Sequence, residues 1–250
     1  MIPWIRSETF VLAGITFRTW GTFVALGFTC AAWLAYRRAK RAGLAAERVW
    51  DLAFWVLLCA IIGARLFHVA FYDLAHYLAH PLDIVNPLLP GYAMFGGWLG
   101  GALAFFAYVR KQRLAFLPFA DAFAFAIPLG IGIGRLGCFL IHDHPGLPTT
   151  FLLGMQYPDG IVRHDLGLYL SLIGFATVLG FVWLSRKGSQ ERAPGFWLAC
   201  LMLVEAVTRF FLDFLRIADA RWLMLTPTQW LSVPLFFGGL WLILRRVRVA

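Results

Sequence analysis

Apolar stretches of about twenty residues recur along the whole chain, and this is the length that an α-helix needs to cross roughly 30 Å of hydrocarbon. Of the 250 residues, 61% are hydrophobic and 14% are charged. In a soluble domain, about 45–50% of the residues are hydrophobic and about 25% are charged. The sequence therefore predicts an all-α integral membrane protein with about seven transmembrane helices, in which residues 1–250 form one transmembrane domain. The expected spans are residues 19–36, 50–71, 93–109, 117–141, 166–184, 195–215 and 228–244.

Most of the 22 lysine and arginine residues lie in alternate loops between these spans. The basic clusters follow the first, third, fifth and seventh spans, within residues 37–48, 110–113, 186–192 and 245–248. Because basic loops stay on the cytoplasmic side, this pattern predicts a multi-pass protein with its N-terminus outside and its C-terminus in the cytoplasm. It also accounts for the net charge of +9 without a nucleic-acid partner.

The two loops that this topology places on the outer face, residues 72–92 and 142–165, are rich in histidine and aspartate. All histidines except His68 lie in these loops. An unperturbed imidazole has a pKa of about 6.5, so histidine exchanges a proton near neutral pH. We therefore expect any proton transfer by these residues to take place near the outer face.

Three arginines, Arg65, Arg135 and Arg209, fall inside the predicted spans. A charge at the centre of a bilayer costs about 2.5–3.5 kcal/mol on insertion scales, so such residues usually face a cavity or a partner. The guanidinium fork never loses its charge and matches the oxygens of a phosphate. These arginines are therefore candidates for binding a phospholipid head group.

The sixth span repeats a charged residue every four positions, at Glu205, Arg209 and Asp213, and Arg216 follows on nearly the same side. Residues at this spacing form one stripe on a helix. Two interpretations stay open. The stripe is either a buried ladder of ion pairs that locks helix packing or a set of acids that orients Arg209 as a fixed anion clamp.

Glycine recurs in two of the spans. Gly132, Gly134 and Gly137 spell GxGxxG, but this pattern indicates a dinucleotide site only between a strand and a helix. Inside a membrane span, glycine more often permits close helix packing. We interpret the run at residues 96–101, which includes Gly96 and Gly97, in the same way, and it would also let backbone amides approach a ligand.

Several sequence motifs, in order along the chain, resemble those of the bacterial phosphatidylglycerol–prolipoprotein diacylglyceryl transferases, which are seven-span enzymes of the plasma membrane. Residues 134–146, GRLGCFLIHDHPG, are similar to the family signature G-R-x-G-N-F-x-N-x-E-x-x-G. The other similar segments are RTWG at 18–21, GARLFHVAFY at 63–72, FGGWLGG at 95–101, RHDLGLYL at 163–170, TRFFLDFLR at 208–216 and TPTQWLSVP at 226–234.

The resemblance implies a reaction that moves the diacylglyceryl unit of phosphatidylglycerol onto the lipobox cysteine of a prolipoprotein and releases glycerol phosphate. The thiol must lose its proton, and the departing phosphate must be held. Arg135 and Arg209 match family arginines suited to the phosphate, and Arg65 is a further match. The resemblance also implies supporting roles for Gly146 and Tyr169. No cofactor or metal is expected, and the expected partners are the lipid bilayer, phosphatidylglycerol and a prolipoprotein signal peptide or another acceptor.

The chain departs from the family motifs at several polar positions. Cys138 and Ile141 replace asparagines, Asp143 replaces a glutamate, and three further departures are Phe95 for histidine, Trp20 for tyrosine and Leu170 for glutamate. The signature gains two histidines, His142 and His144, on either side of Asp143.

These two histidines, together with His164, are the candidate general bases, and Asp143 would orient one of them. A metal site or a plain polar turn at the membrane surface are the alternatives for His142–Asp143–His144. For the whole chain, the alternatives to the transferase are a relative that binds phospholipid without this transfer and one that uses a different acceptor.

Overall fold

The computed structural model describes residues 1–86, 89–187, 193–217, 221 and 223–247. The described part is mostly helical. Its helices are α1 (Thr19–Arg41), α2 (Arg48–Phe71), α3 (Leu74–Ala79), α4 (Met94–Lys111), α5 (Phe116–Ile141), α6 (Leu166–Lys187), α7 (Phe196–Leu212) and α8 (Pro227–Val247), with 3₁₀ turns η1 (Pro81–Val85) and η2 (Asp213–Leu215). Its strands are β1 (Thr9–Leu12), β2 (Ile15–Arg18), β3 (Pro145–Pro148), β4 (Met155–Gln156) and β5 (Val162–Asp165).

Each of the seven predicted spans coincides with one of the long helices, which confirms the helical fold class. Four of them, α2, α5, α6 and α8, are long and apolar enough to cross a membrane. α7 is shorter, with 17 residues. The number of crossings and the orientation of the termini stay predictions. Arg192 and Arg248 of the basic clusters lie outside the described residues.

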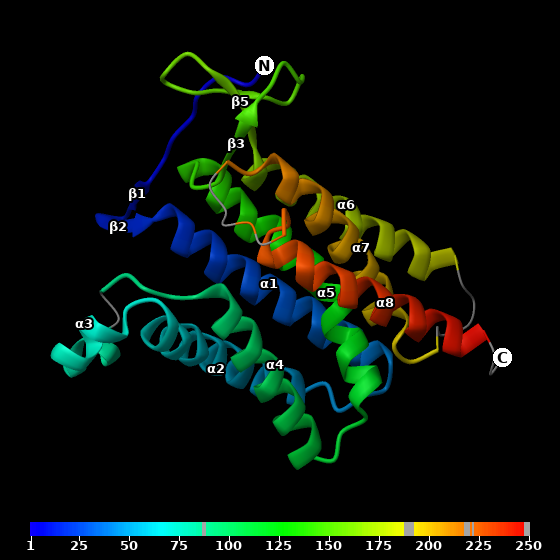
Figure 1. Cartoon of the computed structure of the whole chain (residues 1–250). Coiled ribbons are helices and arrows are strands. Elements are labelled where there is room, and N and C mark those ends of the chain that lie inside the picture. Colours follow the sequence, from blue (N-terminus) through cyan, green and yellow to red (C-terminus); the bar gives the residue numbers. More distant parts are fainter. Residues whose placement is uncertain (87–88, 188–192, 218–220, 222, 248–250) are drawn as a thin grey trace. The chain divides into compact units, whose positions relative to one another are not determined.

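The chain divides into two compact units, one made of residues 39–119 and the other of residues 1–38 with 120–250. In the smaller unit, α2 packs against α4 through glycines (Figure 1). A Cβ on Gly96 would lie 2.2 Å from the carbonyl oxygen of Gly63, and one on Gly100 would lie 2.2 Å from that of Cys59. Gly97 faces Ala60 at an ordinary distance of 3.5 Å. The glycine run thus brings two backbones into contact, as the sequence predicted.

In the larger unit, glycines join α5 to its neighbours α1 and α6, and α7 packs along α8 (Figure 1). A Cβ on Gly137 would lie 2.8 Å from Phe23 of α1, and one on Gly132 would lie 3.0 Å from the ring of Phe175 of α6. The GxGxxG pattern is therefore a helix-packing surface, as predicted. An aromatic cluster around the buried Trp197 fills the contact of α5, α6 and α7.

A small sheet lies at the end of the larger unit where α5 finishes and α6 begins (Figure 1). Strand β5 is central and pairs antiparallel with β3 on one side and β4 on the other. Ile2 bridges to Met155, so the N-terminal segment also reaches this sheet. The sheet fixes residues 142–148, which follow directly after the signature helix.

Candidate active site

Arg135, on the last turns of α5, points toward the turn that follows this helix. Its Nη1 lies 3.4 Å from Nε2 of His144 and 3.9 Å from Sγ of Cys138. The Nδ1 atom of His144 is in turn hydrogen-bonded to Oδ1 of Asp143. The helix and the turn of one signature motif thus bring together a cation, an imidazole and a carboxylate.

The two contacts of His144 indicate which ring nitrogen carries the hydrogen. A carboxylate only accepts, so Nδ1 carries the hydrogen that it donates to Asp143. An arginine only donates, so Nε2 presents its lone pair to Arg135. His144 is about one-quarter exposed. A carboxylate therefore orients the ring of His144, and its Nε2 faces a fixed positive charge.

His142 has a different environment, because its ring is buried and both of its nitrogens contact acceptors. Nδ1 lies 2.7 Å from Oδ2 of Asp165 and Nε2 lies 2.9 Å from the carbonyl oxygen of Ile5. The ring of Trp4 stacks on the imidazole at 4.0 Å between centroids. His142 has a left-handed backbone, with φ of 53°. These contacts leave neither nitrogen available to a substrate, and they hold the turn that carries His144.

Asp165 is a functional residue that the sequence-based site did not include. Its Oδ2 accepts from His142, and its Oδ1 accepts from the backbone N–H of Leu168 at 3.0 Å, which caps α6. Burial and the Asp165 charge raise the pKa of Tyr157, whose hydroxyl lies 3.4 Å from Oδ2. An aspartate directly before an apolar helix is an N-cap signal, so the sequence did carry a clue to this residue.

His164 lies on β5, where Nδ1 is 2.8 Å from the hydroxyl of Tyr169. Burial lowers the pKa of His164, so the ring is neutral at pH 7. Gly146 packs against it, because a Cβ on this glycine would lie 2.9 Å from the Cβ of His164. Gly146 also bridges to Arg216. The last glycine of the signature thus permits a close backbone contact between β3, β5 and the end of η2.

The charged stripe of the sixth span forms two local ion pairs. Nε of Arg209 lies 3.2 Å from Glu205, and Nε of Arg216 lies 3.3 Å from Asp213. The second oxygen of Asp213 accepts from the hydroxyl of Thr226 at 2.5 Å, which ties η2 to the start of α8. Both arginines act electrostatically on Arg135. The acids therefore orient arginines that lie near Arg135, and the role of Arg209 as an anion clamp stays a prediction.

An apolar cavity of about 210 Å³ opens between α7 and α8. Val207 and Phe210 of α7 line it together with Phe237 of α8. Val207 and Phe210 flank Arg209 in the sequence. Space for an apolar chain thus lies along the helix that carries one of the cations.

Arg65 lies in the smaller unit, where its guanidinium is buried and bound to the protein itself. It donates to backbone carbonyls at six positions, Asp83, Ile84, Asn86, Leu89, Pro90 and Gly91, at distances of 2.6 to 3.3 Å. Buried arginines need such partners. Through these hydrogen bonds, Arg65 holds the segment between α3 and α4 in place.

Cys138, Asp143 and His144 also meet the distance condition for a metal site, since a ligand atom of each lies within 4.8 Å of the others. The guanidinium of Arg135, however, contacts two of these three residues. A dication beside this fixed positive charge would be repelled. The cluster is therefore better suited to proton transfer next to an anion.

The long apolar helices define a membrane-type protein, in which an arginine and a carboxylate-bound histidine lie together near two further arginines. The model of the prolipoprotein diacylglyceryl transferase family matches residues 8–245 of the chain. The chain therefore belongs to this family of transferases.

Curated relatives match this chain over nearly the full length of both sequences. A protein named phosphatidylglycerol–prolipoprotein diacylglyceryl transferase from Nitratidesulfovibrio vulgaris (strain Miyazaki F) is 33% identical, over 97% of this chain and 94% of its own length. Proteins of the same name from Cereibacter sphaeroides and Geobacter sulfurreducens are each 33% identical, over 99% and 95% of this chain and over 98% and 94% of their own lengths.

Proposed function

We propose that this chain transfers the diacylglyceryl group of phosphatidylglycerol to the lipobox cysteine of prolipoproteins in the bacterial plasma membrane. The observation that carries this proposal is the contact series Asp143–His144–Arg135 inside the signature segment of a family member. It supplies a base and a phosphate-binding cation side by side. The curated relatives carry the name of this reaction.

In the proposed reaction, the phosphate of the lipid binds Arg135, with Arg209 adding positive charge from α7. Nε2 of His144, no longer in contact with the guanidinium, takes the proton of the acceptor thiol. The sulfur attacks the glyceryl carbon that bears the phosphate ester. A carbon–sulfur bond forms, the carbon–oxygen bond breaks, and its electron pair goes to the departing glycerol phosphate. Arg135 stabilises the charge that builds up on this phosphate.

Two other predicted site residues, His142 and Arg65, act through position in this proposal. His142 fixes the turn through Asp165, and Arg65 fixes the segment before α4. His164, with Tyr169 beside it, is the second candidate base, because its ring is neutral at pH 7. The cavity between α7 and α8 would take part of an acyl chain.

The proposed topology has seven crossings, with the N-terminus outside and the C-terminus in the cytoplasm. It is supported by the long helices at all seven predicted positions and by the basic clusters between them. The signature turn would then lie near the outer face. We propose one functional domain, because the family match runs through both compact units.

The test is transfer of a labelled diacylglyceryl group from phosphatidylglycerol to a lipobox peptide in proteoliposomes. Wild type should form the thioether product. Arg135→Ala should lose about 100-fold to 1000-fold in rate, as expected for the loss of a group that stabilises a developing charge. Arg37→Ala, which removes an arginine from the predicted cytoplasmic cluster, is the matched control.

Full activity of Arg135→Ala would refute the phosphate assignment. No product from wild type, while a curated relative is active in the same assay, would refute the acceptor. Unaltered phosphatidylglycerol that co-purifies with the inactive protein would then identify a lipid-binding relative.

A further inference from the structure

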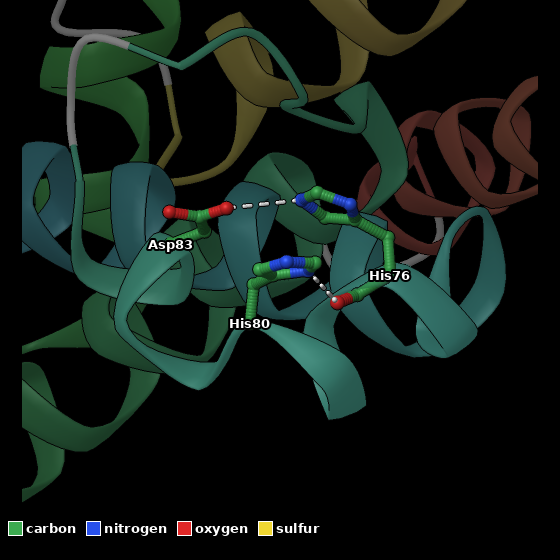
Figure 2. Close-up of side chains that lie close together, drawn as sticks. All are labelled: His76, His80 and Asp83. Carbon is green, nitrogen blue, oxygen red and sulfur yellow. Dashed lines mark hydrogen bonds and ion pairs between the residues drawn. The ribbon is translucent and has the colours of Figure 1, made fainter.

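The segment between α2 and α4 brings two histidines and a carboxylate together, and none of them belongs to the signature motif (Figure 2). His76 lies on α3, His80 follows the last residue of this helix, four positions after His76, and Asp83 lies on η1. Nε2 of His76 is 3.0 Å from Oδ2 of Asp83, and the two imidazole rings stack with centroids 5.0 Å apart. One ligand atom of each residue lies within 4.8 Å of the others.

These distances are close to those of a zinc site. Zinc binds imidazole nitrogen at about 2.0–2.1 Å, which puts the ligand atoms of a tetrahedron roughly 3.3 Å apart. The His76–Asp83 pair already has this separation. His80 is exposed, and its ligand nitrogen lies within 4.8 Å of the ligand atoms of the other two residues.

The second nitrogen of His80 already has the hydrogen bond that metal-bound histidines make. Nδ1 of His80 lies 3.4 Å from the carbonyl oxygen of His76 (Figure 2). A carbonyl only accepts, so Nδ1 carries the hydrogen and Nε2 keeps its lone pair. Histidine ligands usually donate their other ring N–H to a carbonyl or carboxylate, which fixes the tautomer.

Arg65 holds the backbone on which the cluster is built. It donates to the carbonyl oxygens of Asp83 and Ile84, and its guanidinium lies over the ring of Tyr77 of α3. One buried side chain thus anchors both α3 and η1. Arg65 contacts the backbone oxygen of Asp83, whereas the carboxylate pairs with His76. Arg65 therefore holds the backbone of Asp83, and the carboxylate faces the histidine.

From this geometry we propose that His76, His80 and Asp83 form a binding site for one divalent transition-metal ion, with zinc as the preferred ion. Two imidazoles and one carboxylate suit zinc, whereas magnesium and calcium prefer oxygen ligands. A water completes the tetrahedron on the exposed side. The ion joins α3 to η1. The site is separate from the signature residues and does not depend on the transfer reaction.

The experiment measures zinc binding by the full-length protein in detergent, purified with a tag that contains no histidine and stripped with a chelator. Zinc is titrated in competition with a chromophoric chelator, and bound metal is counted by mass spectrometry. Wild type should bind one zinc per chain. His76→Ala, His80→Ala and Asp83→Ala should each bind at least about 100-fold more weakly, more than the loss of an outer-shell partner.

Three variants act as matched controls. His68→Gln removes a histidine of the same unit outside the cluster, and Asp73→Asn removes a nearby carboxylate. Cys138→Ser removes a ligand of the other cluster. All three should keep wild-type zinc affinity. His80→Cys supplies another zinc ligand, should retain binding, and serves if His80→Ala does not fold.

The absorption of substituted Co²⁺ gives an independent readout. The wild-type spectrum should show four-coordinate cobalt, and His80→Cys should add a thiolate charge-transfer band. Absence of zinc binding by wild type, unchanged affinity in His76→Ala and Asp83→Ala, or loss of binding in Cys138→Ser would each overturn the proposal.

Discussion

Nη1 of Arg135 lies 3.4 Å from Nε2 of His144, so a permanent cation contacts the basic nitrogen of an imidazole. Such a contact forms only while that nitrogen has a lone pair, because arginine has no acceptor. Asp143 binds the opposite nitrogen and fixes this tautomer. The pair therefore combines an anion-binding group and a proton acceptor.

The first prediction concerns His144 and its orienting carboxylate. His144→Gln should lower kcat for transfer by about 100-fold to 10,000-fold, the usual contribution of a general base. Asp143→Asn should lower it less, because the ring loses its orientation but keeps its lone pair. Transfer to a lipobox peptide in proteoliposomes measures both effects.

The control for these variants is His68→Gln, which removes a histidine from the other compact unit. A wild-type rate for His144→Gln would exclude His144 as the base. The same assay on His164→Gln would then show whether His164, the second candidate, takes the proton.

The second prediction concerns the buried pair of His142 and Asp165, whose side chains are 1% and 2% exposed. Removing one partner of a buried pair costs about 3–5 kcal/mol. His142→Ala should therefore lower the free energy of unfolding by about this amount, and Asp165→Ala by about 1 kcal/mol more, because it also uncaps α6. Unfolding in mixed micelles measures these values.

The double variant tests whether the two residues act as a pair. It should lose clearly less stability than the sum of the single variants, because the second substitution removes an already unpaired group. Simple additivity would show that His142 and Asp165 stabilise the fold independently.

The third prediction is a pH dependence of stability at His164. Burial lowers the pKa of this ring below its ordinary value of 6.5. Below about pH 6.5 the ring in the unfolded chain binds a proton that the folded chain excludes. The stability that comes from the neutral ring is therefore complete above about pH 6.5, and it is lost as the pH falls from there toward the lower pKa of the folded chain.

The melting temperature should therefore fall on acidification from about pH 7.5 to about pH 5.5, and His164→Gln should reduce this fall. His68→Gln, another histidine removal, is the control. An identical fall in wild type and His164→Gln would contradict the prediction.

The fourth prediction separates two roles of Arg65. Arg65→Lys keeps the charge, but an ammonium has three donors and no planar fork. It should release the backbone carbonyls, lower the melting temperature and speed hydrogen exchange over Pro81–Asn86. Mass spectrometry of exchanged peptides measures this effect.

Arg48→Lys, a change in an exposed ion pair on the same helix, should leave exchange unchanged. If Arg65→Lys lost transfer activity while exchange over Pro81–Asn86 stayed at the wild-type level, Arg65 would bind the donor lipid, as the sequence predicted.

The predictions from the sequence and the structure differ mainly in the contacts between residues that are far apart in the chain. Apolar length predicted the position of every long helix, since burying a helix in a membrane needs about twenty apolar residues. The β3–β5–β4 sheet and the β1–β2 hairpin were not predicted, because strands of two to four residues carry almost no periodic pattern. The prediction that the glycine runs permit close helix packing was confirmed, because close contact between helices follows from the missing side chain alone.

The sequence by itself determined the helical membrane class, the family and the set of charged residues in the signature, since length, composition and local motifs are properties of neighbouring residues. Only the tertiary structure decided what each of these residues contacts. His142 and His144 are two positions apart, yet one contacts Asp165 and Ile5 and the other contacts Arg135. Arg65 and Arg135 both lie in predicted spans and both match arginines of the family. Arg65, however, binds backbone carbonyls, whereas Arg135 contacts a histidine. The contacts of His142 and Arg65 join residues that are 18 to 137 positions apart in the chain, which folding alone brings together.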